Sequence, residues 1–221
     1  MVHTIGILGV GRVGSAIART AVSAGFVVNV AGSGSAEDIQ LLADVVVPGA
    51  HAMSAADVVA SADLVIVAIP LHKYRSIPQS LLTGKLVVDT MNYWPPIDGV
   101  LEDFEQQTTS SEVVRDHFTG AEIVKTLNHI GYHDLEIGAR PAGAPGRRAL
   151  GMAGDSLAGV AAVADVIERF GFDAVATGPL RSGAVLQPGQ PIFGGHHTAV
   201  QLRDALPHPE NDMSLSILDH A

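Results

Sequence analysis

The chain has 221 residues, 47% hydrophobic and 16% charged, so it can bury a full core as one domain or two. A formal net charge of −10 argues against nucleic acid as a partner, because no basic field would attract phosphates. Cysteine is absent, which excludes disulfides and thiolate metal sites and fits a reducing cytoplasm. No apolar run approaches the roughly 20 residues that span a bilayer, and the start lacks the basic segment of a signal peptide. We therefore expect a cytoplasmic protein that does not bind membranes.

The first residues have the order strand, glycine turn and helix. Residues 5–10 form an apolar run, and residues 14–24 are predicted to be helical. Between them, Gly9 permits a tight turn, Gly11 lets the backbone approach a phosphate, and Gly14 lets the helix pack closely on the strand. The start of such a helix offers free N–H groups and a positive dipole end to an anion. This stretch predicts a bound dinucleotide.

The end of the second strand, residues 26–30, indicates which dinucleotide is bound. A carboxylate there binds the ribose of NAD, whereas hydroxyls and basic groups accept the 2′-phosphate of NADP. Here the strand continues into a turn without an acid, and Ser35 is the expected N-cap of a helix over residues 36–46. We therefore predict NADP rather than NAD, with Arg12 as the best cationic candidate. The expected cofactor residues in this turn are Ser33, Gly34 and Ser35.

The next elements alternate between strands and helices. A short strand is predicted at residues 51–53, a helix from residue 54 or 55 to 60, and strands at 64–69 and 86–92. The two longer strands end where ligands bind in open α/β sheets, which makes their last residues cofactor candidates. Tyr93 and Trp94 follow, either as a wall for a planar substrate or as packing beneath a loop. The cofactor candidates at these strand ends are Ala68, Ile69, Pro70 and Asn92.

The middle of the chain completes a Rossmann-type fold. Residues 97–107 are predicted to be loosely structured, 109–118 to form a helix, and 122–127 to form the sixth strand. The alternation predicts an α/β fold with a doubly wound, mostly parallel sheet. We expect a nucleotide-binding domain at residues 1–128 and a small extension at 129–221 that completes the sheet and the substrate edge.

The extension is predicted to contain two further strands. Helices are expected at residues 132–138, from residue 155 or 156 to 170, and at 197–206, and strands at 149–154 and 172–177. Residues 181–195 are expected to form a loop, and the tail after residue 207 to be extended. Earlier in the chain, a loop is also expected at residues 71–74. A loop at residues 140–148 with three arginines (Arg140, Arg147 and Arg148) could bind an anionic substrate tail, or could be surface charge or a dimer contact. The extension is too short for a large helical substrate domain. We therefore expect the substrate at an open sheet edge, between Pro70, Asn92, His129 and Pro179.

Histidines raise the questions of proton transfer and of metal binding. His129 is expected at the end of a strand and titrates near neutral pH, so it is either a proton donor or a hydrogen-bonded structural residue. His129 and His133 have the spacing of two metal ligands on a helix, but no third ligand is evident nearby, so we predict no metal site.

Several separated blocks of the chain together resemble the coenzyme F420-dependent NADP oxidoreductases and their small Rossmann relatives, which include the reductase domain of STEAP-type metalloreductases. The blocks are residues 7–14, 67–70, 87–92, 124–128, 140–148 and 177–180, the last of which contains Pro179 and Leu180. The resemblance implies a homodimeric enzyme that moves hydride between NADP(H) and a flat, flavin- or deazaflavin-like small molecule. It assigns the pyrophosphate to Val10, Gly11, Arg12 and Val13, the 2′-phosphate to Ser33, and the nicotinamide to Ile69 and Pro70.

The chain departs from the family at two positions. Gly34 stands where family members usually place an arginine after the 2′-phosphate serine. Asn128 precedes His129 where the deazaflavin enzymes have a histidine before a threonine, and an asparagine there matches the metalloreductase-like branch. Asn128 and His129 are the candidate catalytic residues.

Two alternatives to a deazaflavin reductase remain open. One is an NADPH reductase of a flavin, a quinone or a small carbonyl. The other is a sensor or partner protein that binds NADP without catalysis. An enzyme predicts an open, aromatic and proline-lined cleft beside the nicotinamide, whereas a sensor predicts that side chains from residues 180–193 fill this space.

Overall fold

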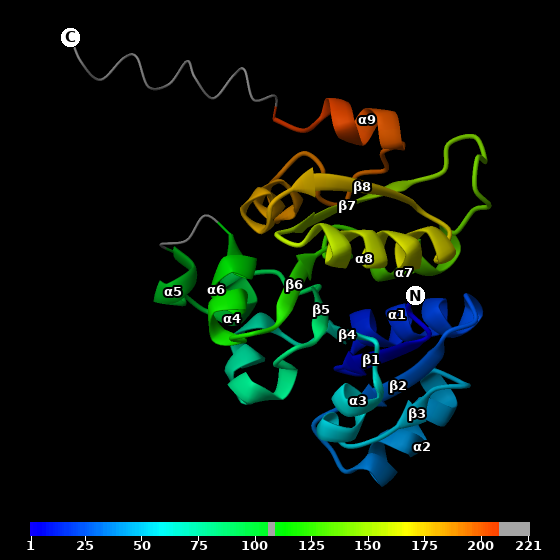
Figure 1. Cartoon of the computed structure of the whole chain (residues 1–221), viewed down its shortest axis with the longest axis vertical. Coiled ribbons are helices and arrows are strands. Elements are labelled where there is room, and N and C mark those ends of the chain that lie inside the picture. The colour runs from blue at the N-terminus through cyan, green and yellow to red at the C-terminus, as the bar shows by residue number, and fades with distance from the viewer. Residues whose placement is uncertain (106–108, 208–221) are drawn as a thin grey trace.

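The computed structural model describes residues 1–105 and 109–207. One sheet of eight strands, in the order β3-β2-β1-β4-β5-β6-β7-β8, runs through both predicted parts of the chain (Figure 1). The strands are β1 (Thr4–Leu8), β2 (Val27–Ala31), β3 (His51–Ala52), β4 (Leu64–Val67), β5 (Leu86–Asp89), β6 (Glu122–Lys125), β7 (Ala149–Gly154) and β8 (Asp173–Gly178). The Rossmann-type α/β fold is thereby confirmed.

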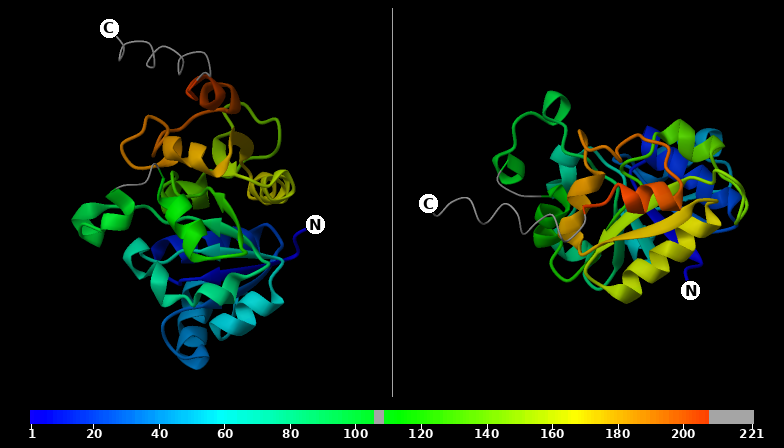
Figure 2. Two further views of the ribbon diagram at one scale, coloured as in Figure 1. Left: turned by 60° about the vertical axis from the view of Figure 1, so that its left-hand side comes forward. Right: turned by 90° about the horizontal axis from the view of Figure 1, so that it is seen from above.

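Helices cover both faces of the sheet and alternate with the strands along the chain (Figures 1 and 2). The α-helices are α1 (Arg12–Ser23), α2 (Ala36–Val46), α3 (Ala55–Ser61), α4 (Pro95–Asp98), α5 (Glu102–Glu105), α6 (Ser110–His117), α7 (Tyr132–Ile137), α8 (Leu157–Arg169) and α9 (Ala199–Asp204). The 3-10 helices are η1 (Leu71–Ser76), η2 (Gln79–Leu82) and η3 (Leu180–Leu186).

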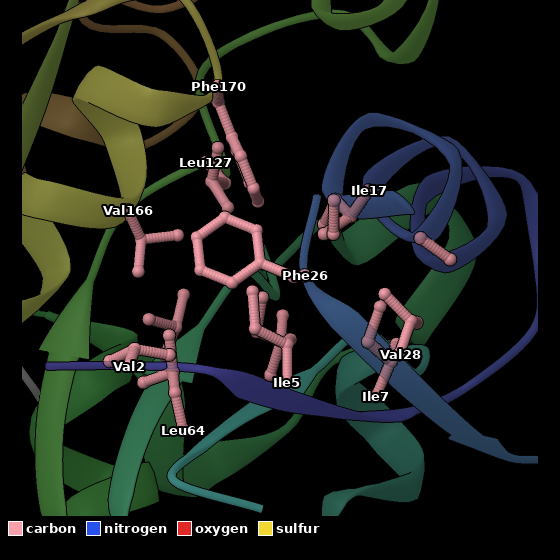
Figure 3. Packing of buried hydrophobic residues seen from close by; sticks show 14 of the residues in the cluster. Val2, Ile5, Ile7, Ile17, Phe26, Val28, Leu64, Leu127, Val166 and Phe170 are labelled. Atoms are coloured by element: carbon pink, nitrogen blue, oxygen red, sulfur yellow. The ribbon is translucent and has the colours of Figure 1, made fainter. Parts of the chain in front are cut away.

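The central strands are buried on both faces, which explains their continuous apolar sequence. One face packs against α1, α2 and α8, and its core includes Ile5, Ile17, Phe26 and Val166 (Figure 3). The other face packs against α3, α6 and the 3-10 helices, with Phe118 at its centre. Alternate residues of β4 point into the two cores. The resulting layers hold the carboxyl ends of β1, β4 and β5 in fixed register.

The sheet reverses direction at β7, a feature that the sequence did not indicate. β1 to β6 are parallel, but β7 runs antiparallel to β6, with Val124 opposite Gly154, and β8 runs parallel to β7. The end of β8 therefore lies at the same edge of the sheet as the start of β6, with β7 between the two strands. The residues that directly follow β8, Pro179 and Leu180, are consequently placed at the opposite edge from the carboxyl ends of β1, β4 and β5.

Most predicted elements occur within one to three residues of their expected bounds. The helix at 36–46 and the strand at 149–154 agree with the prediction at both ends. Two loop predictions were wrong, because residues 71–76 and 180–186 form 3-10 helices. The loosely structured stretch at 97–107 contains the one-turn helix α5, and residues 106–108 of that stretch, like the tail from residue 208, lie outside the described residues.

Candidate active site

The glycine turn after β1 has the geometry that the sequence predicted. Gly9 has a φ of +114°, and a Cβ atom there would lie 2.3 Å from the carbonyl oxygen of Ala68. A Cβ on Gly14 would lie 1.9 Å from the carbonyl oxygen of Gly9. Gly9 and Gly14 are thus required by the fold itself, since a side chain on Gly9 would clash with the residue after β4 and one on Gly14 would push α1 away from the turn.

Gly11 is required for a different reason. It has an ordinary φ of −75°, and a Cβ atom there would meet no other atom within 4 Å. The missing side chain therefore leaves open space at the start of α1, where Gly11 is the N-cap and no side chain caps the helix. Free N–H groups and the positive end of a 12-residue helix face this space. The turn fits the pyrophosphate of a dinucleotide.

A cavity of about 590 Å³ lies at the carboxyl ends of β1, β2 and β4. Ser33 lines it, as predicted, and so does Lys73, whose exposed side chain lies on η1. Ser35 is engaged elsewhere: its hydroxyl accepts the N–H of Asp38 at 3.2 Å and caps α2. The lining is Leu8, Gly9, Val10, Gly11, Ala31, Gly32, Ser33, Ile39, Leu42, Ala55, Ala68, Ile69, Pro70, Lys73, Ser76, Ile77, Pro78 and Leu81. Its size and lining suit the adenosine half of a dinucleotide.

A second cavity, of about 480 Å³, lies on the other side of Pro70. Gly11, Ala68, Ile69 and Pro70 line both cavities, so they meet over the glycine turn. We call this second one the acceptor cavity. Its lining is Gly11, Arg12, Val13, Ala68, Ile69, Pro70, Leu71, Thr90, Met91, Asn92, Trp94, Ile97 and Asp98. None of these residues comes from 180–193, the segment that a sensor would use to fill this space.

The two aromatic residues after β5 have different roles. Trp94 lines the acceptor cavity and is 47% exposed, so its ring is available to a ligand. Tyr93 stacks on Phe104, and its hydroxyl donates to Glu105 at 2.6 Å. Tyr93 therefore packs beneath a loop and does not line the acceptor cavity.

Asp98 fixes the wall of the acceptor cavity that carries Trp94. Its carboxylate accepts the backbone N–H of Trp94 at 2.8 Å and faces the ring Nδ1 of His72, also at 2.8 Å. The carboxylate is nearly buried, and it connects α4 to η1. Asp98 and His72 were not predicted as site residues from the sequence. Neither follows a strand directly, and only the folded loop brings them together.

A buried lysine supports the floor of the same cavity. Lys125 is 1% exposed and donates to the carboxylate of Asp89, at 3.2 Å, and to the carbonyl oxygen of Met91. Burial holds the pKa of the Lys125 ammonium below its ordinary value, and the carboxylate of Asp89 opposes this shift. Asp89 in turn accepts the N–H of Met91 and the hydroxyl of Ser111. This network orients the turn that presents Met91 and Asn92.

Asn128 acts on the site through Asn92. The side-chain amide of Asn128 donates to the side-chain oxygen of Asn92 at 2.9 Å, and the amide of Asn92 donates to the carbonyl oxygen of Asn128 at 2.8 Å. Asn92 lines the acceptor cavity, whereas Asn128 is buried and also donates to Leu186. The geometry supports Asn128 as a positioning residue and not as a group that touches the substrate.

His129 does not have the surroundings of a proton donor. It is 2% exposed, and its Nε2 accepts the N–H of Gly151 at 3.1 Å. Burial, reinforced by the nearby charges of Arg148 and Lys125, lowers the pKa of His129 to about 3, so the ring is neutral at physiological pH. Of the two interpretations given to His129, the structure supports the hydrogen-bonded structural residue, because β7 covers the ring.

Three predicted substrate residues lie away from both cavities. Arg147 is almost completely buried, and its guanidinium is occupied by Glu168, Asp173 and three backbone oxygens. Pro179 follows the end of β8, which the reversal at β7 directs to the opposite sheet edge, and Leu180 lines a separate cavity there. Arg147 does not fit the expected substrate role because its guanidinium is occupied by groups of the same chain. Pro179 and Leu180 do not fit it because the reversal at β7 places them at the other edge of the sheet.

Neither a metal site nor a membrane-spanning helix is found in the described residues 1–105 and 109–207. No group of three histidine, cysteine, aspartate or glutamate residues among them could hold a metal ion. In the same part of the chain, no helix has the length and apolar character needed to cross a membrane.

Comparison with known proteins finds a family match in the N-terminal part of the chain. Residues 4–93 match the model of a family described as NADP oxidoreductase, coenzyme F420-dependent. Over these residues the chain is similar to this family. The match contains the glycine turn and most of the lining of both cavities, up to Asn92. No curated protein matches the chain.

Solved structures share the fold over most of the chain. A hypothetical protein from Sinorhizobium meliloti is 26% identical, with a TM-score of 0.77 over 89% of this chain and 95% of its own. A candidate F420-dependent NADP reductase from Arthrobacter sp. FB24 is 27% identical, with a TM-score of 0.65 over 82% of this chain and 89% of its own. A 3-hydroxyisobutyrate dehydrogenase from Mycobacterium tuberculosis is 18% identical, with a TM-score of 0.60 over 84% of this chain and 57% of its own. At this identity the likeness shows the fold alone. The family and its named neighbours are oxidoreductases.

Proposed function

We propose that this protein is an NADP(H)-dependent oxidoreductase that transfers hydride between the nicotinamide and a planar, flavin- or deazaflavin-like acceptor. The observation that carries this proposal is the pair of cavities that meet over the glycine turn at Ile69 and Pro70. A dinucleotide that binds with its pyrophosphate at Gly11 would extend one half into each cavity. The family match and the Arthrobacter neighbour support the same conclusion.

The residues of the site serve mainly to position two rings. When bound, the nicotinamide supplies the hydride chemistry, and the protein contributes geometry and electrostatics. Ile69 and Pro70 form the surface that both cavities share, and Asn92, held by Asn128, faces the acceptor cavity. Trp94 offers a flat, partly exposed ring to the acceptor. No acid–base residue is required for hydride transfer itself.

The choice of NADP over NAD rests on Ser33 and Lys73. Both line the larger cavity, which contains no carboxylate among its lining residues. A carboxylate would repel the 2′-phosphate, whereas a hydroxyl and an ammonium group attract it. Lys73 can supply the positive charge that Gly34 does not. Arg12 lines the acceptor cavity and is assigned to the pyrophosphate.

One experiment tests the proposed activity. Purified protein is mixed with NADPH and a panel of acceptors (a deazaflavin, FMN, riboflavin, quinones and ferric chelates), and the nicotinamide absorbance is followed. We expect turnover with at least one planar acceptor and tighter binding of NADP than of NAD. Measurable binding of NADPH without turnover of any acceptor would favour the sensor function. Light scattering of the purified chain tests the homodimer that the family resemblance implies.

A further inference from the structure

The charges around the acceptor cavity differ from those that an acceptor with an anionic tail requires. A phosphate or polycarboxylate tail is normally bound by arginine or lysine side chains with free donors. The arginine-rich loop at residues 140–148 was one candidate for this role. In the structure, Arg147 and Arg148 are both buried, and their side chains donate to groups of the same chain. Arg140 lines another cavity, which shares no lining residue with the acceptor cavity.

The segment that continues from the wall of the acceptor cavity, residues 98–105, is acidic. Asp98 lines the cavity, and α5 follows within a few residues (Figure 1). Tyr93, the residue before Trp94, holds α5 in place, because its hydroxyl accepts the N–H of Leu101 and donates to the carboxylate of Glu105. Residues 98–105 contain no lysine or arginine, and their acids are Asp98, Glu102, Asp103 and Glu105.

The cations near the acidic segment do not cancel its negative charge. His72 faces the carboxylate of Asp98, and Arg75 pairs with Asp103, so both are engaged with acids of the segment. Among the described residues that line the acceptor cavity, Arg12 is the one lysine or arginine. Arg12 follows Gly11 in the turn where the cofactor's own phosphates are proposed to bind. With NADP bound at this turn, its phosphates would engage Arg12, and the described lining residues would offer no free lysine or arginine to an anionic acceptor.

From these observations we infer that the acceptor is a planar ring without an anionic tail, and that it stacks on Trp94. This inference rests on the proposed function and narrows it to neutral or cationic acceptors, such as a riboflavin-like ring or an uncharged quinone. The physical reason is that a dianion next to the acidic segment is repelled, with little help from the solvent-screened cation Arg12.

The chain contains its own probe for the test, because Trp94 is its single tryptophan. Riboflavin and FMN carry the same ring and differ by one phosphate. Each is titrated into the protein at saturating NADP⁺, and quenching of the Trp94 fluorescence gives the dissociation constant. We expect FMN to bind about tenfold more weakly than riboflavin at low ionic strength, and we expect high salt to reduce the difference. Equal or tighter binding of FMN, or no quenching by either flavin, would overturn the inference.

A pair of charge variants makes the test specific. Glu102→Lys reverses one exposed charge of the acidic segment, and Asp165→Lys makes the same change on the exposed side of α8. Glu102→Lys is expected to reduce the ratio of the two dissociation constants several-fold, while Asp165→Lys leaves it unchanged. Equal effects of both variants would contradict the inference. NADPH oxidation is a separate readout, so loss of turnover with the flavin preference intact would refute the proposed function alone.

Discussion

The strongest single prediction concerns Gly11, because the structure separates its role from those of the other two glycines of the turn. In Gly11→Ala the new methyl group meets no atom of the protein within 4 Å, and a φ of −75° suits alanine. We therefore expect the fold to tolerate the change, with a cost of about 1 kcal/mol or less from the poorer N-cap. The same methyl group enters the space assigned to the pyrophosphate.

The expected effect on NADP binding can be estimated from the cost of inserting a methyl group into a filled space. That cost is roughly 1–3 kcal/mol, which corresponds to a dissociation constant raised about 5- to 150-fold. Gly14→Ala should behave in the opposite way: its methyl group would lie 1.9 Å from the carbonyl oxygen of Gly9, so the folded state itself must move. Strain of roughly 1–3 kcal/mol or more outweighs the gain of about 1 kcal/mol from helix propensity.

Isothermal titration calorimetry with NADP, together with urea unfolding, measures both quantities. Gly131→Ala is the matched control, because Gly131 is also a glycine N-cap, with a φ of −64°, and it lines neither of the two cavities. A Cβ atom on Gly131 would come no closer than 3.5 Å to its nearest neighbour, the carboxylate of Asp134. If Gly11→Ala binds NADP as tightly as the unchanged protein, the pyrophosphate does not lie at this turn, and the reasoning fails.

Three further predictions follow from the charged and buried residues. Lys73→Ala should reduce the preference for NADP over NAD about tenfold while NAD binding changes little; an unchanged ratio of dissociation constants would exclude Lys73 as the 2′-phosphate contact. Lys125→Met should destabilise the protein by about 3–5 kcal/mol in urea unfolding, since it leaves the carboxylate of Asp89 buried without its partner, and adding Asp89→Asn should restore part of that loss. The pKa of His129 is lowered to about 3, below its unfolded value near 6.5, so its contribution to stability is present above about pH 6.5 and is lost as the pH falls toward 3. The free energy of unfolding should therefore fall less steeply with decreasing pH in His129→Gln than in the unchanged protein, and parallel pH profiles would contradict the buried, neutral state.

Local signals in the sequence were sufficient for the order of the elements. The glycine turn, the apolar run of β4 and the cap at Ser35 are decided by neighbouring residues, through backbone sterics, burial on both faces and a side-chain hydrogen bond. For the same reason the sequence alone placed Gly11, Ser33, Pro70 and Trp94 at the ends of strands, where both cavities lie.

The direction of a strand in a sheet is not a local property, and here the sequence reasoning failed. β7 has the sequence of an apolar strand whether its neighbour runs parallel or antiparallel, and only the pairing of Val124 with Gly154 decides between them. That reversal placed Pro179 at the opposite edge of the sheet from Pro70. Pairing between distant side chains is equally invisible in one sequence, since Arg147 finds Glu168 and Asp173 only when α8 and β8 are folded beside it. Sequence determined which residues the strands present at their ends, and tertiary structure decided which of those ends share a site, because the contacts that fix direction and pairing join residues far apart in the chain.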